Sequence, residues 1–153
     1  VVINKNYRMA HDELVLRHLS FAIYGSSSYR SSMPKFLNQC MLELGELSEK
    51  DLIRLKENFL SALDTAFIIF GQDTFKKSLA IPEHKKVVNK PLFETVSVCF
   101  ANINKEERDI LINRKEDVVT AFIELLNNPK FDAAISKSTA NTERVQTRFK
   151  MVE

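Results

Sequence analysis

The chain has 153 residues, of which 22 are basic and 20 are acidic, so its formal net charge is only +2. A single domain of this length buries roughly 68–70% of the surface of its unfolded chain and needs neither disulfides nor a metal to be stable. The nearly balanced charge excludes a field over the whole molecule that would draw it to nucleic acid or to a membrane surface. Any contact with nucleic acid therefore has to come from a local patch.

The cysteines and the apolar runs point to a cytoplasmic protein. Cys40 and Cys99 are isolated from each other, and no signal peptide precedes them, which is typical of a reducing compartment. The longest unbroken apolar run, residues 66–70, is far shorter than the roughly 20 residues that cross a bilayer. We therefore predict a cytoplasmic location and no membrane partner.

The first predicted helix covers residues 8–25. Asp12 is placed to cap its start and Glu13 lies in its first turn, where a negative charge meets exposed amide donors. Gly25 can adopt the left-handed conformation that ends a helix. The apolar side chains fall at helical spacing and predict a face turned to the core: Leu16, Leu19 and Ile23.

A second and a much longer helix follow a serine-rich turn at residues 26–32. Pro34 suits the first turn of the second helix, and Gly45 closes it. Ser48, with Asp51 three residues later, resembles a capping box and opens a helix that spans roughly residues 49–70. Because residues 66–70 are apolar all round, we expect that end of the long helix to be buried on every side.

The second half of the chain predicts further helices. Pro91 opens one that runs to Ile103, although the β-branched residues 95–98 leave a strand as an alternative. Further helix starts or apolar turns follow at Asn104, at residues 116–117 and at residues 131–135. In the last predicted helix, Val145, Phe149 and Val152 face inward. The basic residues of that helix face outward: Arg144, Arg148 and Lys150. The fold class is therefore all-α: one domain over residues 1–153, an irregular bundle of about six to eight helices around the long helix at 49–70.

The chain carries no complete catalytic or metal-binding motif. His11 and His18 share a helix face, but no third ligand falls at helical spacing. The adjacent acids occur at predicted helix starts, where capping and the helix dipole explain them without catalysis. We predict no catalytic residue, no metal and no cofactor, and we do not expect this chain alone to be an enzyme.

Basic residues form three groups that could contact nucleic acid: the pair Lys76-Lys77 and two groups that we predict as candidates. Lys85 and Lys86 follow His84 in a predicted loop, and Arg144, Arg148 and Lys150 lie on the last helix. A basic side chain that meets a phosphate adds affinity that falls with salt. A solvated helix face or loop is the alternative interpretation of both groups.

The first helix also resembles a known family. Arg8-Met9, residues 12–17 and Phe21 resemble the signature R-M-x-D-x-E-L-V-L-R-x-L-x-F of the domain of unknown function 262 family, typified by GmrSD-type restriction systems. Later residues resemble the family's closing pattern, so the similarity covers nearly the whole chain: Phe131, Ile135, Thr139, Val145 and Arg148.

This resemblance implies a functional setting. Proteins of the family carry an N-terminal ParB-like domain with a D-G-x-Q-R motif that handles nucleotide and supports DNA cleavage, so the parent protein would be an NTP-dependent DNA endonuclease. The present chain contains no D-G-x-Q-R and begins with Val1, so we expect it to be the C-terminal helical fragment.

The expected function is that of a non-catalytic helical domain of a bacterial phage-defence or restriction protein, which supports the ParB-like domain by packing, DNA positioning or assembly. The partners that follow are that domain, DNA and further copies of the chain. The residues expected to anchor the domain interface are Arg8, Asp12, Arg17 and Arg148. The alternative is a free-standing helical module that binds protein or nucleic acid.

Overall fold

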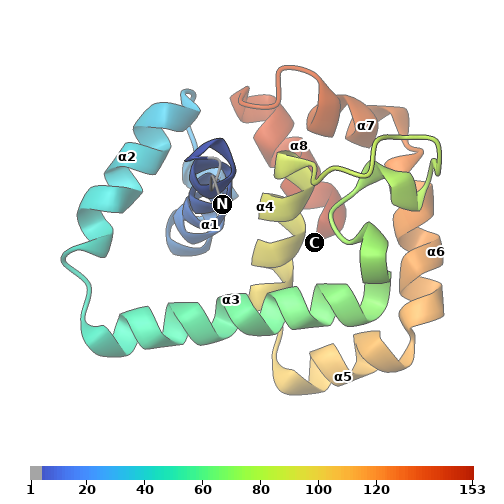
Figure 1. The fold of residues 1–153 in the computed structure, drawn as a ribbon, viewed down its shortest axis with the longest axis horizontal. Helices are drawn as coiled ribbons and strands as arrows, with labels where there is room; N and C mark the ends of the chain where they lie inside the picture. The colour runs from blue at the N-terminus through green and yellow to red at the C-terminus, as the bar shows by residue number, and fades with distance from the viewer. Residues whose placement is uncertain (1–4) are drawn as a thin grey trace.

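The computed structural model describes residues 5–153, with side chains from Ala10 onward, and it forms an irregular bundle of α-helices (Figure 1). Short 3-10 turns lie at Ser26–Ser28, Gly71–Asp73 and Lys77–Leu79. The helices are α1 (Lys5–Tyr24), α2 (Met33–Leu44), α3 (Glu49–Phe70), α4 (Lys90–Ala101), α5 (Lys105–Asn113), α6 (Lys115–Leu126), α7 (Pro129–Ser136) and α8 (Thr142–Val152). Within residues 5–153 no strand forms, so the all-α prediction is confirmed and residues 95–98 are helical.

Helix α4 is the most enclosed element of the bundle. It contributes to three apolar clusters, with Val98 packed among α1, α2 and α8, Val96 and Phe100 among α3, α5 and α6, and Leu92 beside α6 and α7. Its run of apolar residues lets it be buried on nearly all sides. Helix α4 therefore passes through the middle of the molecule and has one end on each side of the core (Figure 1).

The starts of α3 and α5 follow the capping chemistry that the sequence predicts. The Ser48 hydroxyl accepts a hydrogen bond from Asp51 N, and Asn104 forms a complete capping box with Glu107. At the start of α4 the Asn89 side chain, which was not predicted to be a cap, accepts from Leu92 N. These bonds satisfy amide donors that have no partner inside their own helix.

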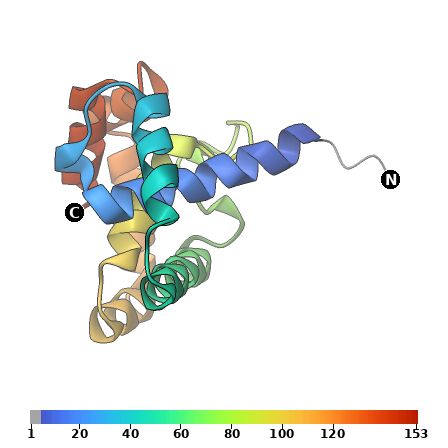
Figure 2. The same cartoon turned by 90° about the vertical axis from the view of Figure 1, so that its left-hand side faces the viewer.

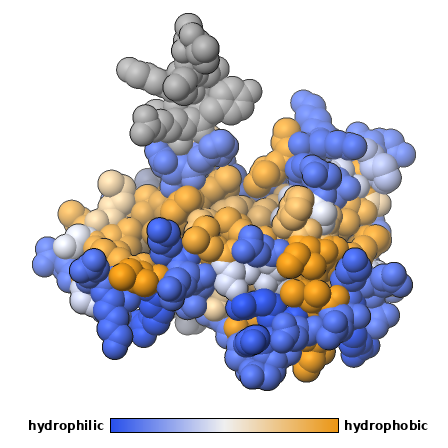
Figure 3. Space-filling view, turned by 60° about the horizontal axis from the view of Figure 1, so that its bottom comes forward, coloured by the Kyte–Doolittle hydropathy of each residue, from blue (hydrophilic) through white to orange (hydrophobic). Residues whose placement is uncertain are grey.

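Helix α3 has the predicted length, but its C-terminal end differs from expectation. Gly71 ends it with φ 57°, a left-handed conformation that glycine adopts readily. Phe67 and Ile68, expected to be buried, are 55% and 50% exposed. Helices α4, α5 and α6 pack against the side of this helix end that carries Phe70, and Phe67 and Ile68 lie on a side that stays exposed. In Figure 1, α5 lies beyond this half of α3. Figure 3 shows apolar side chains along this face with hydrophilic ones between them.

Helix α1 begins earlier than the sequence analysis places it. It starts at Lys5, so Asp12 lies exposed inside the helix and does not cap it. Residues 5–11 contain lysine, arginine, methionine and alanine and no glycine or proline, which favours extension of the helix. Figure 2 shows α2 crossing α1, and its view down α3 shows that α1 and α3 run in different directions. No helix in the described part of the chain combines the length and apolar character of a membrane span.

Candidate functional site

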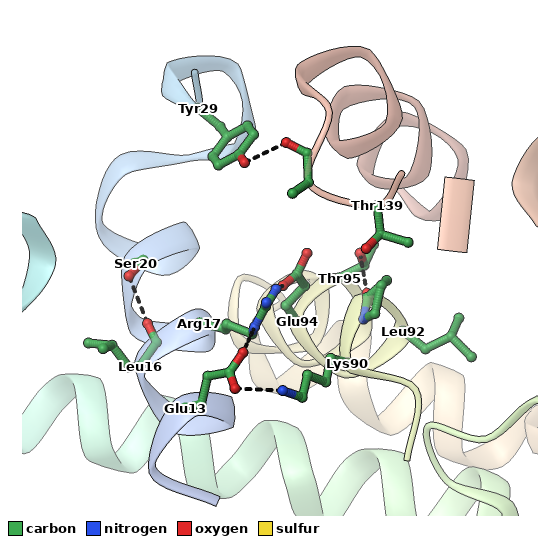
Figure 4. A network of polar contacts seen from close by, with 12 residues as sticks. Glu13, Leu16, Arg17, Ser20, Tyr29, Lys90, Leu92, Glu94, Thr95 and Thr139 are labelled. Carbon is green, nitrogen blue, oxygen red and sulfur yellow. Dashed lines mark hydrogen bonds and ion pairs between the residues drawn. The ribbon is translucent and has the colours of Figure 1, made fainter. Parts of the chain in front are cut away.

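A chain of ion pairs joins α1, α4 and α8. Lys90 Nζ lies 2.5 Å from Glu13 Oε2, Glu13 Oε1 accepts from Arg17 Nε at 2.8 Å, and Arg17 Nη1 donates to Glu94 Oε2 at 2.9 Å. Figure 4 shows these four side chains in succession. The other carboxylate oxygen of Glu94 accepts from Arg148 Nη2. Glu94 thus links an arginine of the first helix to an arginine of the last.

The position of Arg148 corrects the sequence prediction that it points outward. Its side chain has no exposed surface, and its Nη1 donates to the carbonyl oxygens of Ala134 and Thr139 at 3.3 and 2.7 Å. The reason is its phase on α8: with Val145, Phe149 and Val152 it completes the i, i+3, i+4, i+7 stripe of a buried helix face. A buried charge requires a partner, and Glu94 supplies it.

Sequence reasoning missed Glu94, which is fully buried. The signal available was a single acidic residue inside the otherwise uncharged run at residues 91–100. Buried ion pairs often add little net stability, because desolvation of both charges offsets their attraction. Removal of only one charged partner is costly, however, because the other charge stays buried without compensation. The Arg17–Glu94–Arg148 group therefore fixes the relative positions of α1, α4 and α8.

A concave pocket of about 570 Å³ lies where the start of α4 meets α1, α7 and the segment at residues 77–90. Five of the lining residues are basic or histidine, and no carboxylate is among the described residues that line it. The lining is Arg17, Lys77, His84, Lys85, Val87, Val88, Asn89, Lys90, Pro91, Ile135, Ser136 and Thr139. We call this site the basic pocket.

The ion pairs behind the basic pocket leave it positively charged. The lysines and arginines of the lining, together with Arg148, outnumber the acids that pair with them, five to three. The acids in question are Glu13, Glu94 and Asp132. An anion that entered the pocket would therefore meet an excess of positive charge in a partly desolvated site, where electrostatic attraction is stronger than in water.

Arg17 is the most rigidly placed of these donors. Its Nε and Nη1 are fixed by Glu13 and Glu94, and among the described residues no hydrogen bond involves its Nη2. Burial alone would lower the pKa of Arg17, but the charge of Glu94 and the bonds to Glu13 and Glu94 raise it above its ordinary value. The guanidinium is therefore held charged and oriented, with one nitrogen left for a ligand.

The start of α4 adds backbone polarity to the same pocket. Asn89, Lys90 and Pro91 line it, and the Asn89 side chain is held by Leu92 N and by the carbonyl oxygen of Ile135. The N-terminal end of a helix carries a partial positive charge, which favours an anion near it. The helix end and the basic side chains therefore act in the same direction.

Lys77 and Ser136 form a contact that must be distinguished from a nucleophilic pair. Lys77 Nζ lies 3.0 Å from Ser136 Oγ, a spacing found in Ser–Lys catalytic pairs. Lys77 Nζ also lies 2.5 Å from a carboxylate oxygen of Asp132, and this hydrogen bond lowers the pKa of Asp132. Lys77 Nζ donates to both Asp132 and Ser136, whereas a lysine that activates a serine must accept the hydroxyl proton. The geometry suits binding and not catalysis.

The structure separates the residues that the sequence analysis grouped. Of the residues predicted to contact nucleic acid, Lys85 lines the basic pocket, while Lys86, Arg144 and Lys150 are not among its lining residues. Arg148 has no exposed surface for a ligand.

The residues predicted to anchor a domain interface also separate. Arg17 and Arg148 are paired with acids of this chain, Asp12 is exposed, and the side chain of Arg8 lies outside the described residues. Lys77, named only as part of a basic cluster with Lys76, also lines the pocket. Lys90 was not predicted, because only the fold brings it to this site.

Two further findings bear on function. Among the described residues, no group of three or more His, Cys, Asp or Glu side chains is arranged to hold a metal ion. Comparisons of this chain with protein-family models, with curated proteins and with solved structures returned no match.

Proposed function

We propose that this chain is a non-catalytic helical domain that binds the phosphate groups of DNA in the basic pocket. The observation that carries the proposal is the pocket itself, in which Arg17, Lys77, Lys85 and Lys90 line a concavity that no carboxylate enters among the described residues. Guanidinium and ammonium groups donate strong, charge-assisted hydrogen bonds to phosphate oxygens. Contacts of this kind position a nucleic acid without reading its sequence.

The resemblance to the domain of unknown function 262 family supplies the proposed setting. In that setting the domain belongs to a bacterial phage-defence or restriction protein and holds DNA for an N-terminal ParB-like neighbour, the site of NTP-dependent cleavage. The rigid link from Arg17 through Glu94 to Arg148 supports a positioning role, because it fixes the basic pocket relative to three helices. A free-standing binding module is the second candidate, and a mainly apolar concavity lined by residues of α4, α5, α6 and α8 favours it.

The test uses two neighbouring lysines that differ in position. Lys85 lines the basic pocket, and Lys86 does not. The affinity of each variant, Lys85→Gln and Lys86→Gln, for fluorescently labelled single-stranded and duplex DNA is measured by anisotropy between about 50 and about 200 mM salt. We expect Lys85→Gln to weaken binding roughly threefold to tenfold at low salt and to reduce the salt slope by about 1.

Lys86→Gln is the matched control, because it removes the same charge from the same segment. We expect it to change the affinity less than twofold, a difference of about 0.4 kcal/mol. Equal losses from the two variants would show that only the general charge of the segment matters. If wild-type protein binds neither DNA at low salt, the proposed function is wrong.

A further inference from the structure

A second concavity lies at the other end of α4. Its volume is about 1020 Å³, and residues of α4, α5, α6 and α8 line it together with Phe70 of α3. Its walls are mainly apolar, and they include Val98, Leu111, Phe122 and Leu125. Ile110, which also lines it, is 56% exposed. We call this site the apolar groove.

Acidic side chains surround the apolar groove. Glu107 of α5, Glu124 of α6 and Glu153 after α8 are exposed members of its lining, and no lysine, arginine or histidine is among the described lining residues. The chain as a whole has a net charge of +2, so this negative rim is a local feature. Three carboxylates from three separate segments would attract a ligand that carries positive charge at its margins.

The C-terminal ends of α4 and α6 add to this negative potential, whereas the N-terminal end of α5, where Glu107 lies, opposes it. Asn102 directly follows the C-terminal end of α4, and Leu125 belongs to the last turn of α6, so both helices end at the apolar groove. A helix C-terminus carries a partial negative charge, which a basic residue in the last turn usually offsets. Neither α4 nor α6 has such a residue, and Glu124 adds a negative charge beside the end of α6. A bound cation would offset this arrangement.

From this geometry we infer that the apolar groove binds an amphipathic α-helix of a partner protein whose apolar face is flanked by lysine or arginine. Apolar anchors at helical spacing would enter between α5, α6 and α8, in the manner of helix-in-groove recognition. Basic side chains at the margins of that helix would reach Glu107, Glu124 and Glu153. This inference concerns a different site from the basic pocket and does not depend on DNA binding.

The charges decide between this occupant and other apolar ligands. A fatty acid would bring a carboxylate toward the glutamates and toward the C-terminal ends of α4 and α6, where repulsion opposes it. A neutral apolar molecule would gain nothing from the rim. A helix with an apolar face and basic flanks complements both features of the groove. Burial of its apolar face against the walls supplies affinity, and the glutamates at the rim favour ligands with positive charge.

The experiment uses an 18-residue leucine–lysine peptide with apolar residues at i, i+3, i+4 and i+7, labelled for anisotropy. Two peptides serve as probes of specificity: the same pattern with glutamate in place of lysine, and the same composition without helical periodicity. We expect saturable binding of the periodic lysine peptide alone. An equal affinity for the glutamate peptide, or no saturation by any peptide up to about 0.1 mM, would overturn the inference.

Variants of the chain locate the binding site. Ile110→Asn alters the apolar groove, and Ile53→Asn alters a side chain of similar exposure, 50%, that lies on α3 outside it. We expect Ile110→Asn and the charge reversal Glu124→Lys each to weaken peptide binding about tenfold, and Ile53→Asn to change it less than twofold. All three positions are exposed or half-exposed, so circular dichroism should show folded variants. Equal effects of Ile110→Asn and Ile53→Asn would contradict the assigned site.

Discussion

The two ends of α4 support opposite kinds of surface. At its N-terminal end the basic pocket is lined by lysine, arginine and histidine, and a buried network of ion pairs holds Arg17 in place. At its C-terminal end the apolar groove is lined by aliphatic and aromatic side chains, with glutamates at its margin. In each case the sign of the side-chain charges matches the partial charge of that helix end.

This difference shows how one buried helix can organise two surfaces. Side chains of α4 pack into three apolar clusters that cover most of the helix. The two ends of α4 are therefore the parts that can contact a ligand. At the pocket end, the positions of the lining side chains depend on charged hydrogen bonds that need particular partners. At the groove end, the positions of the lining side chains depend on apolar packing, which tolerates substitutions of similar volume. The two regions should therefore respond differently to substitution and to acid.

The largest expected effect comes from Arg148. Arg148→Met preserves most of the apolar length of the side chain but removes the charge, so Glu94 loses one of its two arginine partners and the carbonyl oxygen of Thr139 loses a donor. Loss of one member of a buried ion pair costs about 3–5 kcal/mol in the free energy of unfolding. Chemical denaturation measures this loss.

Arg144→Met is the control on the same helix, because Arg144 is only half-buried and no hydrogen bond or ion pair of its side chain occurs among the described residues. We expect it to change the free energy of unfolding by less than about 0.5 kcal/mol. Similar losses for Arg144→Met and Arg148→Met would contradict the view that the pocket end depends on its ion pairs.

A smaller effect is expected from His18, which contacts the middle of α4. His18 is 1% exposed, its Nδ1 lies 2.8 Å from Ser97 Oγ, and burial lowers its pKa from 6.5 to about 4. Between these values the unfolded chain binds a proton that the folded chain does not, so stability falls as the pH falls from 6.5 toward 4. The expected loss is roughly 2–3 kcal/mol.

Unfolding curves at a series of pH values test this prediction. Protonation of Glu13 and Asp132 in acid also lowers the stability of the protein, because the fold lowers the pKa values of both carboxyl groups. This loss of stability sets in as the pH falls through their ordinary pKa values of 4.5 and 3.8. His18→Gln should therefore flatten the curve between pH 6.5 and 4.5, whereas His11→Gln, at an exposed position, should not. A wild-type slope in the His18→Gln variant would contradict the assignment.

The sequence was sufficient to predict the helices whose signals are local. The hydroxyl of Ser48, Pro34 near the start of α2 and the pair Asn104 and Glu107 act within one helical turn, so their chemistry can be recognised without the fold. The exposure of Phe67 was not predictable in this way. An apolar turn is buried only where neighbouring helices cover it, and no local signal indicates which side of α3 those helices cover.

The candidate site was predictable only in part. The phase of α8 could have indicated that Arg148 is buried, and the isolated acid Glu94 could have indicated its partner. Arg17 lies far in the sequence from Lys77 and Lys85, and the segment between α3 and α4 that carries the two lysines has no periodicity that fixes its path. Their meeting in one pocket is a property of tertiary packing alone.

The most direct test of the proposed function is to record amide chemical shifts by NMR while a short single-stranded DNA is added to the protein. The amides of Lys77, Lys85 and Asn89 in the basic pocket should shift with a common saturation curve, while those of Ile110 and Leu125 in the apolar groove stay unchanged. Shifts confined to the groove or to the surface of α8, with the basic pocket unchanged, would contradict the assignment of this pocket as the DNA-binding site.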